Sequence, residues 1–213
     1  LSRQPIRDQI YLATKLPLTR CHRREDFDSL FETQLERLGT DYVDYYLMHA
    51  ISGSAQWEGL QALGIEGWIR EKKESGAIRQ LGFSFHGSEG DFLALLDRYD
   101  WDFCQIQYNY MNVHYQAGQK GLQAAAQRGL PVVIMEPLLG GKLARGLPQG
   151  AQTAFEKRRP DCSPAAWALN WLWNYEGVTT VLPGTPAPPH QTENLAPAER
   201  ALRDLLAPAY LAA

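Results

Sequence analysis

The 213-residue sequence predicts an α/β fold built on a parallel sheet, of the (β/α)8 TIM-barrel class. Six short apolar runs alternate with segments whose apolar residues recur every three or four positions, which is typical of strands followed by helices. The runs are continuously apolar, as expected for strands of a parallel sheet that is covered on both faces. A closed barrel needs eight strands and roughly 250 residues. We therefore expect one domain over residues 1–213 that holds six of the eight units and is incomplete at its N-terminus.

A doubly wound open sheet is the alternative architecture. Such a sheet usually carries a glycine-rich phosphate loop after its first strand. Here the first predicted strand, residues 10–16, is followed by Pro17-Leu18-Thr19-Arg20. The barrel is therefore favoured.

The elements follow one another with short connections. The strands are predicted at residues 10–16, 42–50, 78–87 with its turn, 103–109, 131–137 and 178–182. The helices are predicted near residues 24–38, 60–74, 92–99, 121–128, 164–172 and 198–206. Gly39 is expected to end the first helix, and Ser163 to cap the fifth with Pro164 at its first position. Residues 51–57, the polar segment that ends at Asp161 and the proline-rich stretch 185–189 are predicted as loops.

Composition excludes several classes of partner. The net charge is -3 without a basic block, which argues against binding nucleic acid or an anionic membrane. No apolar run approaches the roughly 20 residues of a membrane span, and the amino terminus has no signal pattern, so a cytoplasmic protein is expected. Cys21, Cys104 and Cys162 are odd in number and far apart, which indicates neither a disulfide framework nor a metal site.

Two polar side chains stand at the ends of successive predicted strands. Lys15 ends the first strand, and His49 ends the second, just before a turn. Ligands bind at the carboxyl ends of the strands in parallel barrels, so the two residues form a candidate site. The alternatives are an exposed strand-end lysine and a hydrogen-bonded core histidine.

Six segments in order resemble the aldo-keto reductases, across nearly the whole chain and in the positions of that family's strands 3 to 8. They are Ala13-Thr14-Lys15, residues 41–49, the Arg-x-Leu-Gly-Phe-Ser pattern of 79–84, residues 104–109, residues 136–142, and Pro183-Gly184 with Glu193-Asn194-Leu195. The resemblance is closest to a bacterial branch that often carries a C-terminal iron–sulfur extension. No cluster-ligating Cys-x-x-Cys run is present in this sequence.

The resemblance implies roles for individual residues. Lys15 lowers the pKa of a proton-donating tyrosine, and His49 orients the substrate. Ser84 and Gln105 contact the nicotinamide carboxamide, and Met135 stands where the family stacks an aromatic ring. The implied pyrophosphate segment contains Leu138, Gly140, Gly141 and Lys142, and the implied adenosine end contains Gly184, Thr185, His190, Glu193 and Asn194. Since Glu136 would repel a pyrophosphate, we expect it to point away and the backbone N–H groups of 138–141 to bind.

The implied function is NAD(P)H-dependent reduction of a small aldehyde or ketone to an alcohol. The family's tyrosine and aspartate lie upstream of the lysine strand, and only fourteen residues precede Lys15, so half of the catalytic tetrad is absent. A non-catalytic binding or regulatory module is therefore the alternative. Gly184, Thr185 and His190 occupy positions where basic residues usually hold the 2′-phosphate of NADPH. Without them, either NADPH or NADH is expected as cofactor.

Overall fold

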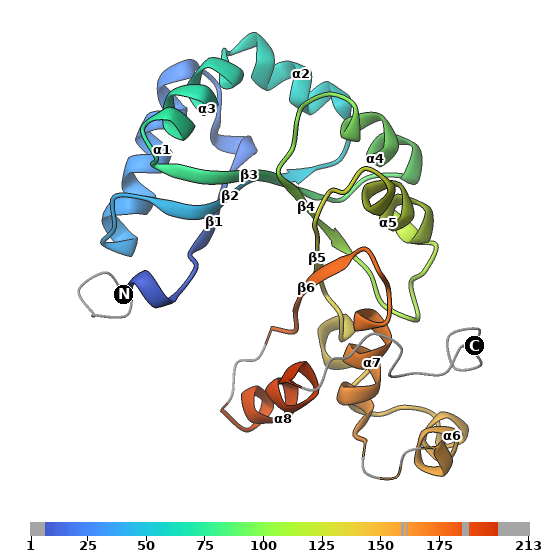
Figure 1. Ribbon diagram of the computed structural model, residues 1–213. Coiled ribbons are helices and arrows are strands. Elements are labelled where there is room, and N and C mark those ends of the chain that lie inside the picture. The colour runs from blue at the N-terminus through green and yellow to red at the C-terminus, as the bar shows by residue number, and fades with distance from the viewer. Residues whose placement is uncertain (1–6, 159, 161, 185–187, 200–213) are drawn as a thin grey trace. The chain divides into compact units, whose positions relative to one another are not determined.

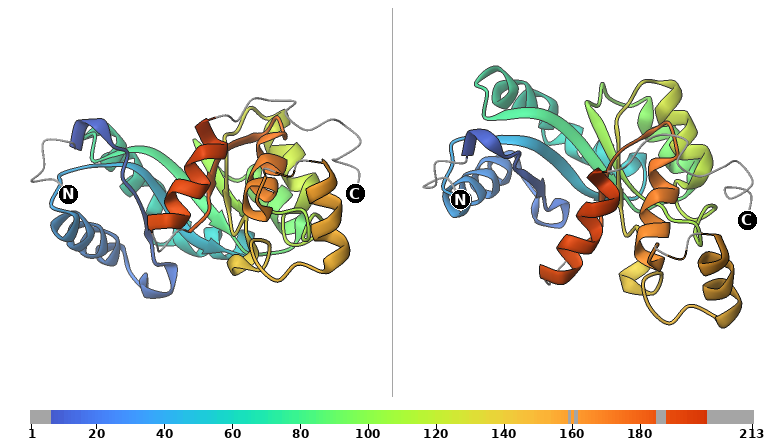
Figure 2. Two further views of the ribbon diagram at one scale, coloured as in Figure 1. Left: turned by 90° about the horizontal axis from the view of Figure 1, so that it is seen from below. Right: turned by 60° about the horizontal axis from the view of Figure 1, so that its bottom comes forward.

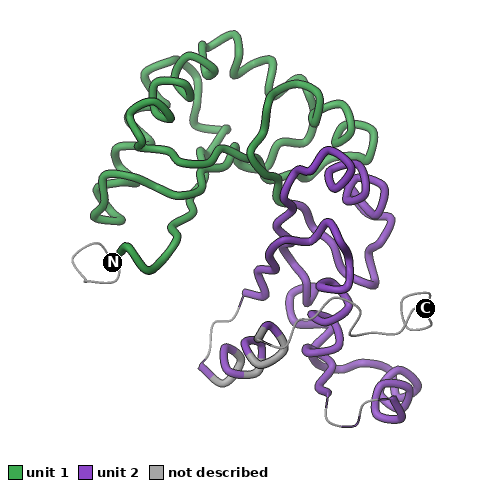
Figure 3. Tube along the Cα trace, in the orientation of Figure 1, with its two compact units in different colours: residues 1–105 green, residues 106–213 purple. Residues whose placement is uncertain are grey.

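The computed structural model describes residues 7–158, 160, 162–184 and 188–199. The chain forms two compact units, Leu1–Gln105 and Ile106–Ala213 (Figure 3). Six strands follow one another in the sheet in chain order, β1 to β6, and every register that the structure gives is parallel. The predicted α/β class with a parallel sheet is confirmed. β1 and β6 stand at the two ends of that order, so the described strands do not close into a barrel.

Unit 1 is built from strands that alternate with helices (Figure 1). Its elements are η1 Arg7–Gln9, β1 Ala13–Leu16, η2 Leu18–Arg20, α1 Arg24–Leu38, β2 Val43–Ile51, α2 Ser54–Ala62, α3 Ile65–Glu74, β3 Ile78–Phe85, α4 Glu89–Leu96 and the first residues of β4 Phe103–Gln107. Aromatic side chains fill the layer between strands and helices, and Phe31 contacts both Tyr46 and Trp68 edge to face. Burial of such rings is the main stabilising contribution in this layer.

The other face of the unit 1 strands carries no described helix of that unit (Figure 1), and we call it the open face. The register pairs Lys15 with Leu47, Leu47 with Gly82, and Gly82 with Phe103. Residues paired in this way point to the same side of a sheet. A Cβ at Gly82 would lie 2.7 Å from the Phe103 ring and 2.6 Å from the Phe103 carbonyl oxygen. Only glycine therefore lets Phe103 cross β3 and pack edge to face on Tyr45 of β2.

Unit 2 continues the alternation. Its elements are the rest of β4, α5 Gly118–Gln127, β5 Val132–Met135, η3 Leu139–Gly141, α6 Gln149–Arg158, α7 Pro164–Trp173, β6 Val178–Leu182 and α8 Pro188–Glu199. Tyr108, Trp171 and Tyr175 form an aromatic cluster in its core. The helix α8 lies beside α7 (Figure 2). This packing fixes the carboxyl-terminal part of the described chain.

Three strands are shorter than predicted, and the local backbone explains two of the changes. β1 begins at Ala13 rather than at residue 10, because the Leu12 N–H donates to the Asp44 carboxylate at 2.8 Å instead of to a strand. β5 ends at Met135 rather than at residue 137, since Glu136 has a positive φ of 53° and leaves the extended conformation. β4 likewise ends at Gln107 rather than at residue 109.

Three helices differ from the prediction. The predicted helix over 60–74 is divided at Gly64, whose φ is 82°, and α2 begins inside the predicted loop 51–57. α6 lies in the predicted polar loop and buries none of its residues, so it has no apolar stripe to signal it. α8 begins at Pro188 within the predicted proline-rich loop, which agrees with proline at a first helical position. Most of the predicted helix 198–206 lies outside the described residues.

The predicted helix ends were confirmed at two places. Gly39 ends α1 in the left-handed conformation with a φ of 63°. The Ser163 hydroxyl accepts from the Ala166 N–H at 3.2 Å, with Pro164 at the first position of α7. Among the described residues, no helix combines the length and apolar character that a membrane crossing requires.

Candidate functional site

Lys15 lies on the open face at the carboxyl end of β1. Its side chain is half-buried, and burial lowers the pKa of its ammonium group. Its backbone carbonyl accepts from the Gln34 side-chain amide of α1 at 2.8 Å. The end of the strand is therefore tied to the helix, which holds the Lys15 backbone in place.

His49 lies on a bulge near the end of β2. Met48 pairs with Phe83 and Ile51 pairs with Phe85, so two residues, His49 and Ala50, stand opposite the single residue Ser84. Ala50 has a φ of 58°, a left-handed conformation that non-glycine residues rarely adopt. Its N–H donates to the Ser84 hydroxyl oxygen at 2.8 Å. The bulge presents the His49 side chain to solvent.

The pKa of His49 is lowered from its ordinary value. Partial burial is the largest cause, and the positive charges of Lys15 and His86 add to it. His86 follows β3 directly, and its backbone N–H donates to the Ile51 carbonyl at 2.9 Å. At neutral pH the His49 imidazole is thus neutral, with one ring nitrogen as donor and the other as acceptor.

Ser84 and Gln105 stand side by side on neighbouring strands. The register pairs them directly, and their exposed fractions are 1% and 6%. A hydroxyl and a primary amide together offer donors and acceptors to a ligand amide. Unit 1 thus carries Lys15 and His49 near the carboxyl ends of β1 and β2, Ser84 next to the last residue of β3, and Gln105 in the middle of β4 beside Ser84.

In unit 2, the predicted pyrophosphate segment forms a tight series of turns after β5. Glu136, Leu139, Gly140 and Gly141 all have positive φ, between 48° and 88°. The Leu139 N–H donates to the Glu136 carbonyl at 3.1 Å, and the Gly141 N–H donates to the Leu138 carbonyl at 2.9 Å. These two N–H groups are bonded within the loop, and the binding of a phosphate by the backbone of 138–141 stays a prediction.

The charges of this loop come from side chains instead. Lys142 and Arg145 are both exposed, and the Arg145 N–H donates to the Gly141 carbonyl at 3.2 Å. Sequence reasoning singled out Lys142 and missed Arg145. Arg145 follows Lys142 by three residues, and this spacing could have indicated that the two cations lie on one turn. Glu136 is exposed at the start of the loop, and Met135 is the half-buried last residue of β5.

The predicted adenosine residues are only partly described. Gly184 is exposed with a φ of 62°, just after β6, and Thr185 lies outside the described residues. His190 and Glu193 lie on α8. Asn194 on the same helix is buried, with 7% of its surface exposed. Unit 2 therefore holds its own set of predicted residues after β5, after β6 and on α8.

A further cluster surrounds Asp44 near the amino end of β2, away from His49. This buried carboxylate accepts from the Leu12 N–H and pairs with Arg7 at 3.0 Å and with Arg79 at 2.9 Å. The guanidinium carbons of Arg7 and Arg79 lie 3.8 and 4.2 Å from the centre of the Tyr42 ring. All of these charges have partners, so the cluster is structural.

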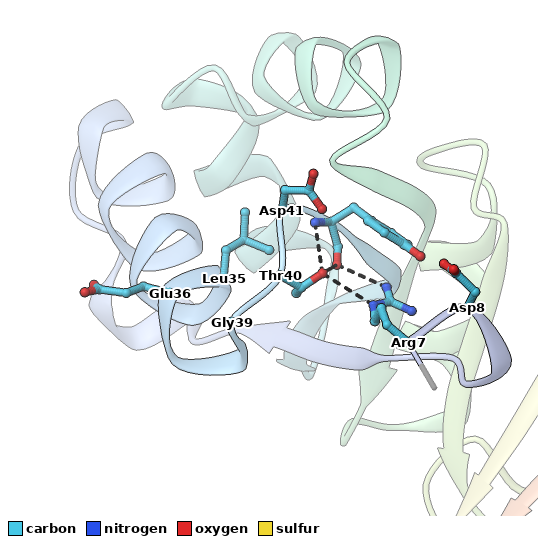
Figure 4. A pocket seen from close by; sticks show the side chains of 8 residues that line it. Arg7, Asp8, Leu35, Glu36, Gly39, Thr40 and Asp41 are labelled. Atoms are coloured by element: carbon cyan, nitrogen blue, oxygen red, sulfur yellow. Dashed lines mark hydrogen bonds between the residues drawn. The ribbon is translucent and has the colours of Figure 1, made fainter. Parts of the chain in front are cut away.

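A cavity of about 560 Å³ adjoins this cluster (Figure 4). Arg7 crosses it and donates to the Thr40 hydroxyl at 3.4 Å and to the Tyr42 carbonyl at 3.3 Å. The cavity is lined by Arg7, Asp8, Leu35, Glu36, Gly39, Thr40, Asp41 and Tyr42. It lies at the strand edge opposite Lys15 and His49, and its arginine bonds within the protein to Ile10, Thr40, Tyr42 and Asp44.

Comparison with known proteins supports a single family. A family model described as "Aldo/keto reductase family" matches residues 1–205. An aldo-keto reductase from Mycolicibacterium vanbaalenii is 31% identical over 169 residues, which make up 78% of this chain and 55% of that protein. Methylglyoxal reductase YeaE from Escherichia coli is 27% identical over 182 residues, which make up 83% of this chain and 60% of that protein. The chain thus spans little more than half the length of these relatives.

Solved structures show the same fold. An aldo-keto reductase from Klebsiella pneumoniae in complex with NADPH has a TM-score of 0.75 at 25% identity, over 98% of this chain and 70% of that one. The holo form of an aldo-keto reductase from Bacillus halodurans has a TM-score of 0.72 at 23% identity, over 92% of this chain and 68% of that one.

Proposed function

From the premise that this chain belongs to the aldo/keto reductase family, we propose that it forms the cofactor- and carbonyl-binding part of an NAD(P)H-dependent reductase with a TIM-barrel fold. The observation that carries the proposal is the placement of Lys15, His49 and Ser84 near the carboxyl ends of three successive strands, with Gln105 of β4 paired with Ser84. Strand ends of this kind hold the active sites of parallel α/β barrels. The product is an alcohol, formed from an aldehyde or ketone.

Ser84 and Gln105 fit a nicotinamide carboxamide. Both are buried and polar, and their hydroxyl and primary amide match the chemistry of a carboxamide. The Ser84 oxygen already accepts from Ala50, so what it offers a ligand is its O–H donor. Gln105 carries a primary amide, the same chemical group as the carboxamide that it would contact. The cofactor supplies the hydride when bound, and these two residues orient its reacting ring.

His49 and Lys15 serve the carbonyl group. The neutral imidazole of His49 donates one hydrogen bond to the carbonyl oxygen and so orients it, because its lowered pKa keeps it uncharged at neutral pH. Lys15 keeps a positive charge beside it that stabilises a phenolate, the state in which a proton-donating tyrosine must exist briefly. The tyrosine and aspartate that complete the family's tetrad match no position of this sequence.

The remaining cofactor contacts are assigned to unit 2. We assign the pyrophosphate to the side chains of Lys142 and Arg145, which are exposed cations on one turn. Met135 stands at the nicotinamide, and Gly184, Thr185, His190, Glu193 and Asn194 at the adenosine. Leu138, Gly140 and Gly141 shape the turn that carries Lys142.

The choice between NADPH and NADH follows from charge. Two Klebsiella pneumoniae relatives were solved with NADPH and with NADP and acetate. No lysine or arginine occupies position 184, 185 or 190 here, so a 2′-phosphate gains no charge-assisted bonds at those positions. We therefore propose weak discrimination between the two cofactors.

The test is a titration of the chain with NADPH and NADH, followed by tryptophan fluorescence quenching, and then an NADPH-oxidation assay with simple aldehydes and methylglyoxal. Quenching together with turnover supports the reductase. Quenching without turnover supports the second candidate, a non-catalytic binding or regulatory module. An absence of quenching by both cofactors refutes the cofactor assignment.

Three finer assignments belong to the same proposal. We place the protein in the cytoplasm, without nucleic-acid partners, and in the family branch that often carries an iron–sulfur extension. The sequence segments at 82–86 and 135–138 support the branch assignment. Sequencing the gene on both sides of this chain tests it, because the extension carries a cysteine cluster that is easily recognised.

A further inference from the structure

We propose that Ser84 is a positioning residue for His49. Its hydroxyl oxygen accepts the Ala50 N–H at 2.8 Å and so fixes the bulge from which the imidazole projects. The inference rests on the proposed function of His49 and adds to the carboxamide contact assigned to Ser84. Its structural part, the control of the His49 position, can be tested without turnover.

The bulge is confined to two residues by regular pairing on both sides. Met48 pairs with Phe83 before it, and Ile51 pairs with Phe85 after it. The four paired side chains are fully buried, with 0% of their surface exposed. Because these flanks are paired and fully buried, His49 and Ala50 are the residues of this part of β2 that the sheet holds least.

The segments that follow β2 and β3 also hold the two strands together beyond the bulge. The His86 N–H donates to the Ile51 carbonyl at 2.9 Å, which continues the pairing of β2 with β3 beyond the bulge. A Cβ at Gly87 would overlap the Ser52 carbonyl oxygen, so the two loops lie in direct contact there. The bulge therefore sits between two fixed points.

The Ala50 N–H needs an acceptor that the sheet does not supply. Ala50 has a φ of 58°, so its peptide group is turned away from the regular strand direction. Ser84 is the one residue of β3 opposite the bulge, and it is 1% exposed. Ala50 is half-buried, and loss of the acceptor for a partly buried N–H is destabilising because solvent replaces the hydroxyl only in part.

Serine has the capacity to serve both neighbours at once. A hydroxyl has two acceptor positions and one donor, and the Ala50 N–H uses one acceptor position. The O–H remains for the carboxamide oxygen of a bound nicotinamide. The same hydroxyl would then bond to the carboxamide of the nicotinamide and hold the part of β2 that carries His49.

The experiment compares three variants of the 213-residue chain with isotope-labelled NMR. Ser84→Ala removes the acceptor, Ser84→Cys replaces it by a weaker one, and Ser75→Ala is the matched control, since the exposed Ser75 hydroxyl bonds only to the Lys72 carbonyl. Loss of one hydrogen bond is expected to speed amide exchange at Ala50 about tenfold in Ser84→Ala, and less in Ser84→Cys. The His49 ring resonances shift in the same order.

The outcomes separate this inference from the proposed function. Unchanged His49 resonances and Ala50 exchange in a folded Ser84→Ala variant overturn it, even if NADPH binding becomes weaker. If Ser84→Ala does not fold, the same measurements on Ser84→Cys decide. If the wild-type chain binds no cofactor but the resonances shift as expected, the proposed function fails and the positioning role stands.

Discussion

Replacement of Asp44 by alanine is expected to destabilise unit 1 by about 4 kcal/mol. Asp44 is 2% exposed and pairs with Arg7, which is 9% exposed, so its removal leaves a buried guanidinium without its counter-charge. Breaking a buried ion pair in this way costs about 3–5 kcal/mol. The Leu12 N–H also loses its acceptor, at about 1–3 kcal/mol. These contributions overlap, because the relaxed Arg7 regains some solvent.

The assay is urea unfolding monitored by circular dichroism. With a slope of about 2 kcal/mol per molar urea, a loss of about 4 kcal/mol lowers the midpoint by about 2 M. Arg79→Met is the matched control, since the Arg79 side chain is 53% exposed and its pair with Asp44 is expected to contribute less than about 1 kcal/mol. Equal midpoints for Asp44→Ala and Arg79→Met would refute the argument that burial of Arg7 decides the effect.

The other predictions concern the open face and the loop charges. Gly82→Ala is expected to cost about 1–3 kcal/mol by overpacking against the Phe103 ring, whereas Gly59→Ala, with no atom within 4 Å, leaves or raises the unfolding midpoint. The His49 titration midpoint, followed by NMR, lies below its ordinary value and rises in Lys15→Met, and a fixed midpoint contradicts the charge argument. Because folding lowers this pKa, the His49 contribution to stability is present above about pH 6.5 and is lost as pH falls. Lys142→Ala is expected to weaken the binding of NADPH, measured by fluorescence quenching, several-fold at low salt and much less at high salt. An effect on affinity that does not depend on salt excludes a charge contact.

Sequence reasoning located the strand ends of unit 1 well because one physical rule decides them. A parallel sheet brings the carboxyl ends of neighbouring strands to one edge, so Lys15 and His49 were predicted to lie there together. The register of the two strands agrees, since Lys15 pairs with Leu47, two residues before His49. The order of strands and helices along the chain was therefore enough to predict that Lys15 and His49 lie at the same edge of the sheet.

The bulge at His49 could not be predicted in the same way. A bulge is visible in a sequence when it interrupts an alternating pattern, but β2 is apolar on both faces and carries no alternation to interrupt. The bond that fixes it joins Ala50 to Ser84, which is 34 residues away. Its existence depends on the register of β2 against β3, and no local pattern reports that register.

The amino-end and carboxyl-end edges of the unit 1 strands differ in how their charged and strained residues are stabilised. Near the amino end of β2, the charges of Asp44 and Arg7 are buried and paired, and they stabilise the unit without facing a ligand. At the carboxyl edge, a half-buried Lys15 with a lowered pKa and a left-handed Ala50 are both unfavourable in isolation. Strain and partial desolvation of this kind persist only where the surroundings fix them, and the regular pairing on both sides of the bulge does so.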